Sequence, residues 1–149
     1  MYCMKQLFIF FIITSLFSAC KKDDEKYSDV PAITFESISP GTVKQFSDSV
    51  IVTIGYVDGN GDLGENGSDV KNAFVTDSRN DLTYGFRVKQ LAPTDASIII
   101  KGKLLIVIPQ VALNNLTGVT ENASFSIYLK DRAGNKSNVV TTSSITISE

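Results

Sequence analysis

Residues 50–64 read VIVTIGYVDGNGDLG, and this stretch decides the fold class. Val50, Val52, Ile54 and Tyr56 occupy alternate positions, so one face of an extended chain would be apolar. That period of two is typical of a half-buried β-strand and differs from the period of about 3.6 of an amphipathic helix. The Asp, Gly and Asn residues that follow are turn formers and end the strand. We therefore predict a strand that runs directly into a tight acidic turn.

The same alternation recurs on both sides of this stretch. We expect further strands around residues 33–38, 73–76, 84–88, 98–100, 104–108, 125–129 and 139–147. Lys101-Gly102-Lys103 is predicted to form a tight turn between two of them, and residues 111–116 a single helical turn. About seven to eight short strands separated by turn residues favour an all-β sandwich over a parallel sheet.

Residues 1–19 have the pattern of a secretory signal peptide. Lys5 precedes an unbroken apolar run from Leu7 to Ile13. The apolar core is too short for a permanent membrane span, which needs about 20 apolar residues. A positive start, a short apolar core and small residues at the exit are features of a cleaved signal.

Ser18, Ala19 and Cys20 resemble the lipobox of bacterial lipoproteins, where a peptidase cuts before a cysteine that carries diacylglycerol. The resemblance implies lipidation at Cys20 and a membrane anchor. An ordinary cleaved signal followed by a chance cysteine is the alternative. Because Cys3 leaves with the signal, no disulfide is expected in the mature chain, and the hydrophobic core must hold the domain.

Residues 20–29 are expected to form a charged tether, because residues 21–26 contain no apolar side chain to bury. A lysine followed by acidic residues behind the cysteine resembles the export signal of Bacteroidetes-type surface lipoproteins. It implies display on the outer face of the outer membrane. A plain spacer, with the protein facing the periplasm, is the alternative. Residues 30–149 remain for one domain.

The motif at residues 128–138, YLKDRAGNKSN, resembles the last hairpin of bacterial immunoglobulin-like domains. Gly134 can adopt the positive φ that such a turn requires, and Asp131 and Asn135 can bond to turn amides. Residues 56–64 resemble the Asp- and Gly-rich turn of immunoglobulin-like Bacteroidetes lipoproteins. Together these resemblances imply an immunoglobulin-like β-sandwich in a lipoprotein of that kind.

The acidic turn is the one candidate for metal chemistry. Asp58, Asn60 and Asp62 lie at a spacing of two, as in a calcium loop, and Asp69 occupies the position of its last ligand. Immunoglobulin topology would also bring Asp131 to this turn.

Leu63 stands where an EF-hand needs glycine, so a true EF-hand is not expected. A calcium loop of another kind remains one interpretation of the acidic turn. The other is a purely structural turn, in which the aspartates bond their own turn amides while Leu63 enters the core.

Composition argues against an enzyme, and no catalytic residue is assigned. His and Trp are absent, and no Gly-x-Ser-x-Gly or phosphate loop occurs. A pair of carboxylates in the acidic region 58–81 is the only catalytic arrangement left open. The formal net charge of −2 and the scattered basic residues do not suggest nucleic acid as a partner.

Two functions stay open. The first is a surface-exposed, non-catalytic binding or adhesion module with a glycan partner, which exposed aromatics such as Tyr84, Phe86 or Tyr128 on one sheet face would support. The second is a structural spacer or an assembly component of an envelope complex with a protein partner. A bare edge strand would favour that second function.

The triplet Asp48-Ser49-Val50 resembles the acceptor of the Bacteroidetes O-glycosylation system. The resemblance implies that Ser49 carries a glycan.

Overall fold

The computed structural model describes residues 27–115 and 117–149, and within these ranges the chain is all-β with no helix. In chain order its strands are β1 (Ala32–Ser39), β2 (Thr42–Lys44), β3 (Val50–Asp58), β4 (Ala73–Asp77), β5 (Thr83–Phe86), β6 (Ile100–Ile108), β7 (Thr120–Ala123), β8 (Phe125–Leu129), β9 (Val140–Thr141) and β10 (Ile145–Ser148). Cys20, the predicted signal peptide and all but the last residues of the predicted tether lie outside the described residues.

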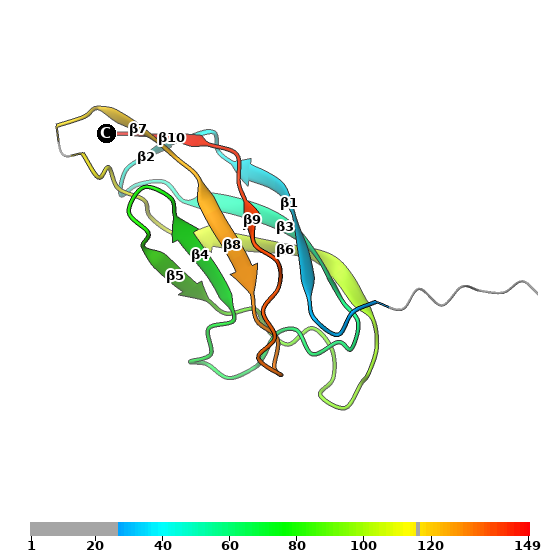
Figure 1. Cartoon of the computed structure of the whole chain (residues 1–149). Coiled ribbons are helices and arrows are strands. Elements are labelled where there is room, and N and C mark those ends of the chain that lie inside the picture. Colours follow the sequence, from blue (N-terminus) through cyan, green and yellow to red (C-terminus); the bar gives the residue numbers. More distant parts are fainter. Residues whose placement is uncertain (1–26, 116) are drawn as a thin grey trace, which may run out of the picture.

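The strands form three sheets (Figure 1). One has the order β1-β3-β6, the second β5-β4-β8-β9, and a small third sheet has the order β2-β10-β7. Neighbouring strands are antiparallel except β2 and β10, which run parallel. Figure 1 shows β3 and β6 behind β4 and β8, so the two larger sheets are stacked as the layers of a sandwich.

One hydrophobic core fills the space between the layers. Val50, Val52 and Ile54 of β3 are fully buried, and so are Phe125 and Ile127 of β8 on the opposite layer. The alternation read from the sequence is therefore confirmed as the division between inside and outside. Complete burial of such a side chain contributes about 1.5–3 kcal/mol relative to exposure, which explains how the domain holds together without a disulfide.

The prediction of a tight turn at residues 101–103 is wrong, because β6 runs without a break through these residues and pairs with β3 along its whole length. Gly102 lies opposite Tyr56 in the register. A Cβ atom at Gly102 would lie only 2.9 Å from Tyr56 Oη, so the glycine makes room for the tyrosine ring rather than for a turn.

Two other predicted elements differ. The helical turn expected at residues 111–116 is absent from its described part, where the backbone amides of Asn114 and Asn115 donate instead to the carboxylate of Glu121. The single last strand is split into β9 and β10, and Thr142 lies in the gap, with its hydroxyl accepting from Phe125 N–H at 3.0 Å. Strands β2 and β7 were not predicted.

The two long sides of the sandwich are closed to different degrees. On the side of β1 and β9, Asn138 bridges the layers by accepting from Ile33 N–H and donating to the Ile33 carbonyl, both at 2.8 Å. On the other side β6 and β5 are edge strands of their sheets. The two layers are therefore joined by hydrogen bonds on the side of β1 and β9, and the side of β6 and β5 is the open side of the sandwich.

Candidate functional site

The acidic turn begins where β3 ends, at Asp58. This residue has 0% exposure, and its Oδ2 accepts from Leu63 N–H at 2.9 Å. Leu63 is itself fully buried and forms an isolated antiparallel bridge with Asp131. The predicted capping role of Asp58 and the predicted entry of Leu63 into the core are both confirmed.

A second turn packs against the first, as the sequence led us to expect. Arg132 N–H donates to the Asp62 carbonyl at 3.1 Å, and the Arg132 guanidinium donates to the carbonyls of Gly64 at 2.9 Å and Gly61 at 3.4 Å. Gly61 and Gly64 both have positive φ, +76° and +84°, which turns these carbonyls without strain. No pattern in the sequence indicated that Arg132 would join the two turns by these hydrogen bonds.

The second turn has the geometry predicted for it. Gly134 has a φ of +87°, and the Asp131 carboxylate accepts from Asn135 N–H at 2.7 Å and from its side-chain amide at 2.8 Å. Both turns thus lie at one end of the sandwich. We call Asp58, Asn60, Asp62 and Asp131 the acidic pole.

Burial and neighbouring carboxylates raise the pKa of two residues of the acidic pole, Asp58 and Asp62. Burial raises the pKa of Asp58; the Leu63 amide lowers it, and the charges of Asp62 and Asp131 raise it further. Burial also raises the pKa of Asp62, with the charge of Asp131 as the next cause, while the Ala133 amide and the Arg132 charge oppose the change. The carboxylates therefore lie close enough to repel each other.

Two carboxylate oxygens at the acidic pole are buried without a hydrogen-bond donor, namely Asp58 Oδ1 and Asp62 Oδ1. Most buried polar atoms in proteins have a partner, so each exception needs an explanation. Asn60 Oδ1 accepts from Asp62 N–H at 3.3 Å. Asp69 is exposed and is not among the charges that perturb Asp58 or Asp62, so the structure leaves it outside the group.

A polar hollow of about 270 Å³ opens over the acidic pole. Its lining includes Asn60, Asp62 and Arg132, together with Thr94, Asp95 and Ser97 from the loop before β6. Within residues 27–115 and 117–149, no three His, Cys, Asp or Glu side chains converge into a complete metal cage. Any cation here would need neutral oxygens as well as carboxylates.

The outward face of the sheet β5-β4-β8-β9 carries a second candidate site. The Phe74 and Tyr128 rings stack with centroids 4.8 Å apart and planes 15° apart. Lys130 Nζ lies 5.6 Å from the Phe74 centroid, and Lys136 Nζ lies 3.9 Å from the Tyr128 centroid. These four side chains form a continuous series that we call the aromatic–lysine ladder.

The rest of this face is polar and carries no carboxylate on its strands. By the register, its outward positions are Phe74, Thr76, Thr83, Gly85, Ser126, Tyr128 and Thr141. Lys71 lies over Gly85, since a Cβ there would meet the Lys71 Cβ at 3.1 Å. Three lysines that are scattered in the sequence thus gather on one face, which the sequence alone did not reveal.

Tyr84 and Phe86 do not share this face with Tyr128, so the grouping of these three aromatics that would support a binding module is not present. Tyr84 pairs with Val75 and Phe86 pairs with Ala73, and both of these partners are fully buried. Paired residues of antiparallel strands share a face, so Tyr84 and Phe86 point inward. Phe74, which was not predicted as a site residue, is the aromatic that accompanies Tyr128.

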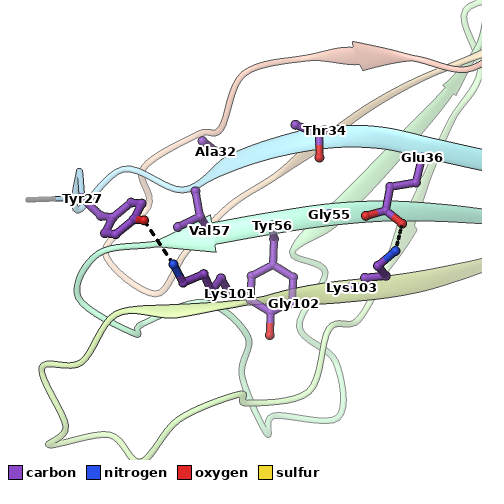
Figure 2. Close-up of a pocket in the computed structure, with 10 residues that line it drawn as sticks. All are labelled: Tyr27, Ala32, Thr34, Glu36, Gly55, Tyr56, Val57, Lys101, Gly102 and Lys103. Atoms are coloured by element: carbon purple, nitrogen blue, oxygen red, sulfur yellow. Dashed lines mark hydrogen bonds and ion pairs between the residues drawn. The ribbon is translucent and has the colours of Figure 1, made fainter. Parts of the chain in front are cut away.

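A third feature is a hollow of about 440 Å³ on the outward face of the sheet β1-β3-β6 (Figure 2). Its floor is low because Gly55 has no side chain; a Cβ there would lie 2.6 Å from Thr34 Oγ1. The Tyr27 hydroxyl lies at one end and accepts from Lys101 Nζ at 3.1 Å, and the Lys103–Glu36 ion pair lies at the other end. Tyr56 points to the opposite face of the sheet.

The open side of the sandwich is lined by apolar and basic side chains. A groove of about 450 Å³ runs between β6 and the segment after β5, and it includes Phe86, Arg87, Lys89, Leu105 and Val107. Leu105 is 67% exposed and Val107 is 48% exposed. Strand β6 is therefore a long edge strand with apolar side chains beside it.

The candidate glycosylation residue, Ser49, lies exposed between β2 and β3, and its hydroxyl donates to the Pro109 carbonyl at 3.1 Å. Neighbouring Val50 is fully buried, so the triplet is at the surface only through Asp48 and Ser49.

The acidic region 58–81 is not one cluster. Asp77 is 2% exposed and pairs with Arg79 at 2.6 Å, and the same guanidinium binds Glu121 at 2.7 Å and the Ala112 carbonyl at 3.0 Å. This ion pair joins the hairpin after β4 to β7 and to the segment before it, and Asp77 is not among the charges that act on Asp58 or Asp62.

No family model, curated protein or solved structure matches the chain. Among the described residues, no helix is long and apolar enough to cross a membrane.

Proposed function

We propose that the chain is a lipid-anchored, surface-exposed lipoprotein whose immunoglobulin-like domain is a non-catalytic binding or adhesion module. The fold assignment is supported by the strand order. A sheet β1-β3-β6 faces a sheet β5-β4-β8-β9, and the early strand β2 runs parallel to the last strand β10. This arrangement resembles immunoglobulin-like sandwiches, which commonly present binding surfaces.

The aromatic–lysine ladder is the observation that carries the binding function. Its ring faces are already covered, because Phe74 and Tyr128 stack on each other and the two lysine ammonium groups lie over the rings. The ladder therefore offers ammonium groups and ring edges to a partner, next to the hydroxyls of Thr76 and Ser126. This chemistry fits an anionic glycan with carboxylate or sulfate groups.

A polysaccharide binding assay tests the proposal. We expect the mature chain to bind sulfated or uronate polysaccharides more tightly than neutral glucans, and to lose this affinity as salt is raised. Tyr128→Ser and Lys136→Ser should weaken binding at least several-fold. Lys103→Ser, on the outward face of the other sheet, is the matched control and should bind as the wild type does. Equal binding by all of these proteins would rule out the ladder as the binding surface.

The edge strand β6 favours the second function, assembly into an envelope complex. An edge strand offers unpaired backbone groups to a strand of another protein, and the apolar side chains Leu105 and Val107 add contact area. A photo-crosslinking amino acid at Leu105 should capture one discrete protein in intact cells. The same amino acid at exposed Phe46 should not. Equal capture from both positions would speak against assembly through β6.

A further inference from the structure

We propose that the groove on the open side of the sandwich binds an extended acidic segment of a protein partner, which adds a strand beside β6. The inference rests on the assembly function proposed for β6 and names the chemistry of the partner. It starts from the unequal layers of the sandwich, because the three-stranded sheet β1-β3-β6 faces the four-stranded sheet β5-β4-β8-β9. Asn138 joins the layers on the side of β1. The place for a further strand in the smaller layer is therefore beside β6.

The backbone of β6 is available to such a strand. In an antiparallel pair only alternate residues bond to the neighbouring strand, and the backbone groups of the other residues point the opposite way. The neighbour of β6 is β3, and no hydrogen bond joins the backbone of residues 104–107 to any other segment of the described chain. An added strand satisfies these backbone groups, which is the source of affinity in β-strand addition.

The groove accepts one row of apolar side chains. Val88 and Ile106, which line it, are buried in the hydrophobic core. Phe86 and Leu91 line it too, and both are partly buried against that core. Successive side chains of a strand point to opposite faces, so an added strand directs every second side chain toward these residues. The occupant is therefore an extended segment with apolar residues at alternate positions.

The charge of the groove selects acidic residues for the remaining positions. Arg87 and Lys89 line the groove and are exposed, and none of the described residues that line it is Asp or Glu. Neither cation takes part in an ion pair within the part of the chain that the structure describes. Arg87 makes only two long hydrogen bonds, to the carbonyls of Asn66 at 3.4 Å and Gly67 at 3.3 Å. Charge complementarity across an interface selects the partner, so these cations favour carboxylates.

A second copy of the chain fits this groove less well. Its own β6 contains Lys101 and Lys103 and no acidic residue. Pairing of two β6 strands would bring these lysines to the side of the sandwich that already carries Arg87 and Lys89. Like charges that face each other across strands or interfaces are destabilising. An acidic segment of another protein is therefore favoured over a dimer.

Peptide binding to the mature wild-type chain tests the proposal. The probe is an octapeptide of alternating valine and glutamate, and the fluorescence anisotropy of a label at its N-terminus measures the affinity. An octapeptide of alternating valine and lysine should bind about ten-fold more weakly or worse, because its charges repel Arg87 and Lys89. The valine–glutamate peptide with every amide N-methylated has no backbone donors and should lose binding to a similar degree.

A charge reversal in the groove provides the matched variant. Lys89→Glu should weaken binding of the valine–glutamate peptide about ten-fold and should strengthen binding of the valine–lysine peptide. Lys44→Glu makes the same change at an exposed position of β2 and should bind both peptides as the wild type does. Equal affinity of the wild type for the two peptides would overturn the proposal. So would unchanged affinities in Lys89→Glu.

Hydrogen exchange of the wild-type chain locates the bound peptide. The valine–glutamate peptide should slow amide exchange at alternate residues within 104–107, where backbone groups point away from β3. Unchanged exchange there would overturn the added strand. Sedimentation of a stable dimer, with those amides already protected before peptide is added, would overturn it in favour of a second copy.

Failure of the acidic peptide can be told apart from failure of the assembly function. If crosslinking at Leu105 captures a discrete protein in cells while the valine–glutamate peptide does not bind, assembly stands and the acidic strand is wrong. The peptide tests do not involve the aromatic–lysine ladder, so Lys89→Glu should bind polysaccharides as the wild type does.

Discussion

At the scale of single residues, burial decides how much a leucine side chain contributes to stability, as Leu63 shows. Leu63 is fully buried in the core at the end of the sandwich. Leu63→Ala should lower the free energy of unfolding by about 2–5 kcal/mol, because it removes buried carbon atoms and leaves a cavity. Leu105→Ala, at a 67% exposed position, is the matched control and should cost under about 0.5 kcal/mol. Urea denaturation measures both, and similar losses would contradict the burial argument.

The titration of Asp58 and Asp62 gives a second prediction at this scale. Burial, and after it the negative charge of neighbouring carboxylates, raises both pKa values above the ordinary 3.8. Between 3.8 and the raised pKa, the folded chain holds more protons than the unfolded chain, so stability rises as the pH falls. We expect a higher melting temperature at pH 5 than at pH 7 in EDTA.

Asp62→Asn provides the comparison for this pH dependence. It removes one of the two titrating groups and should reduce the difference between the two melting temperatures. Glu121 has a lowered pKa and loses its contribution only as the pH falls below its ordinary 4.5, so it does not act between pH 5 and pH 7. If the wild-type chain in EDTA melts at a higher temperature at pH 7 than at pH 5, folding does not raise the pKa values of Asp58 and Asp62.

At the scale of elements, the ion pair around Arg79 connects parts of the fold that share no sheet. Its partners are the 2% exposed Asp77 at the end of β4 and Glu121 on β7. Arg79→Ala should destabilise the domain by about 3–5 kcal/mol, because it leaves Asp77 buried without its partner. Lys103→Ala breaks the exposed pair with Glu36 and should cost about 0–1 kcal/mol. Equal effects in urea denaturation would contradict this distinction.

Alternation predicted the large strands because one residue in two must enter the core. Strands β4 and β8 follow that rule without exception, and β3 follows it except at Gly55, which is buried beside Ile54, and at half-buried Tyr56. The glycine at 102 misled the prediction, since a glycine in a strand and a glycine in a turn look alike in sequence. The deciding contact is Tyr56, which is far from Gly102 along the chain. Strands β2 and β7 are short and gain stability mainly from their pairing with β10.

Part of the candidate site could be predicted because it depends on the local spacing of residues. The spacing of Asp58 and Asp62 is local, and the expected topology brought Asp131 to them. Three other features depend on the directions of side chains across strands. They are the hydrogen bonds of Arg132, the two buried carboxylate oxygens without a donor, and the aromatic–lysine ladder of Phe74, Tyr128 and two lysines. No local pattern encodes those directions.

At the scale of the whole molecule, the described chain begins beside the acidic pole. Gly59 N–H donates to the Ser28 carbonyl at 2.9 Å, and a Cβ at Gly59 would lie 2.6 Å from the Tyr27 carbonyl oxygen. Figure 1 shows the C-terminal end, with β10 and β7, at the opposite end of the sandwich. Cys20 precedes Tyr27 by seven residues, which span about 25 Å at most. A lipid at Cys20 would therefore keep the acidic pole near the membrane and direct β7 and β10 away from it.

The anchor itself is the last prediction. Cys20→Ser should move the protein out of the membrane fraction, or leave it as a longer unprocessed precursor, because serine offers no thiol to the diacylglycerol transfer. Cys3→Ser makes the same change inside the expected signal and should leave anchoring intact. Metabolic labelling with a fatty acid measures both, and the label should disappear only from Cys20→Ser. Because an anchor at Cys20 would leave the strands β7 and β10 farthest from the membrane, we expect an antibody against residues 120–149 to bind intact cells. Labelled Cys20→Ser protein would refute the anchor, and binding only after lysis would place the domain on the periplasmic face.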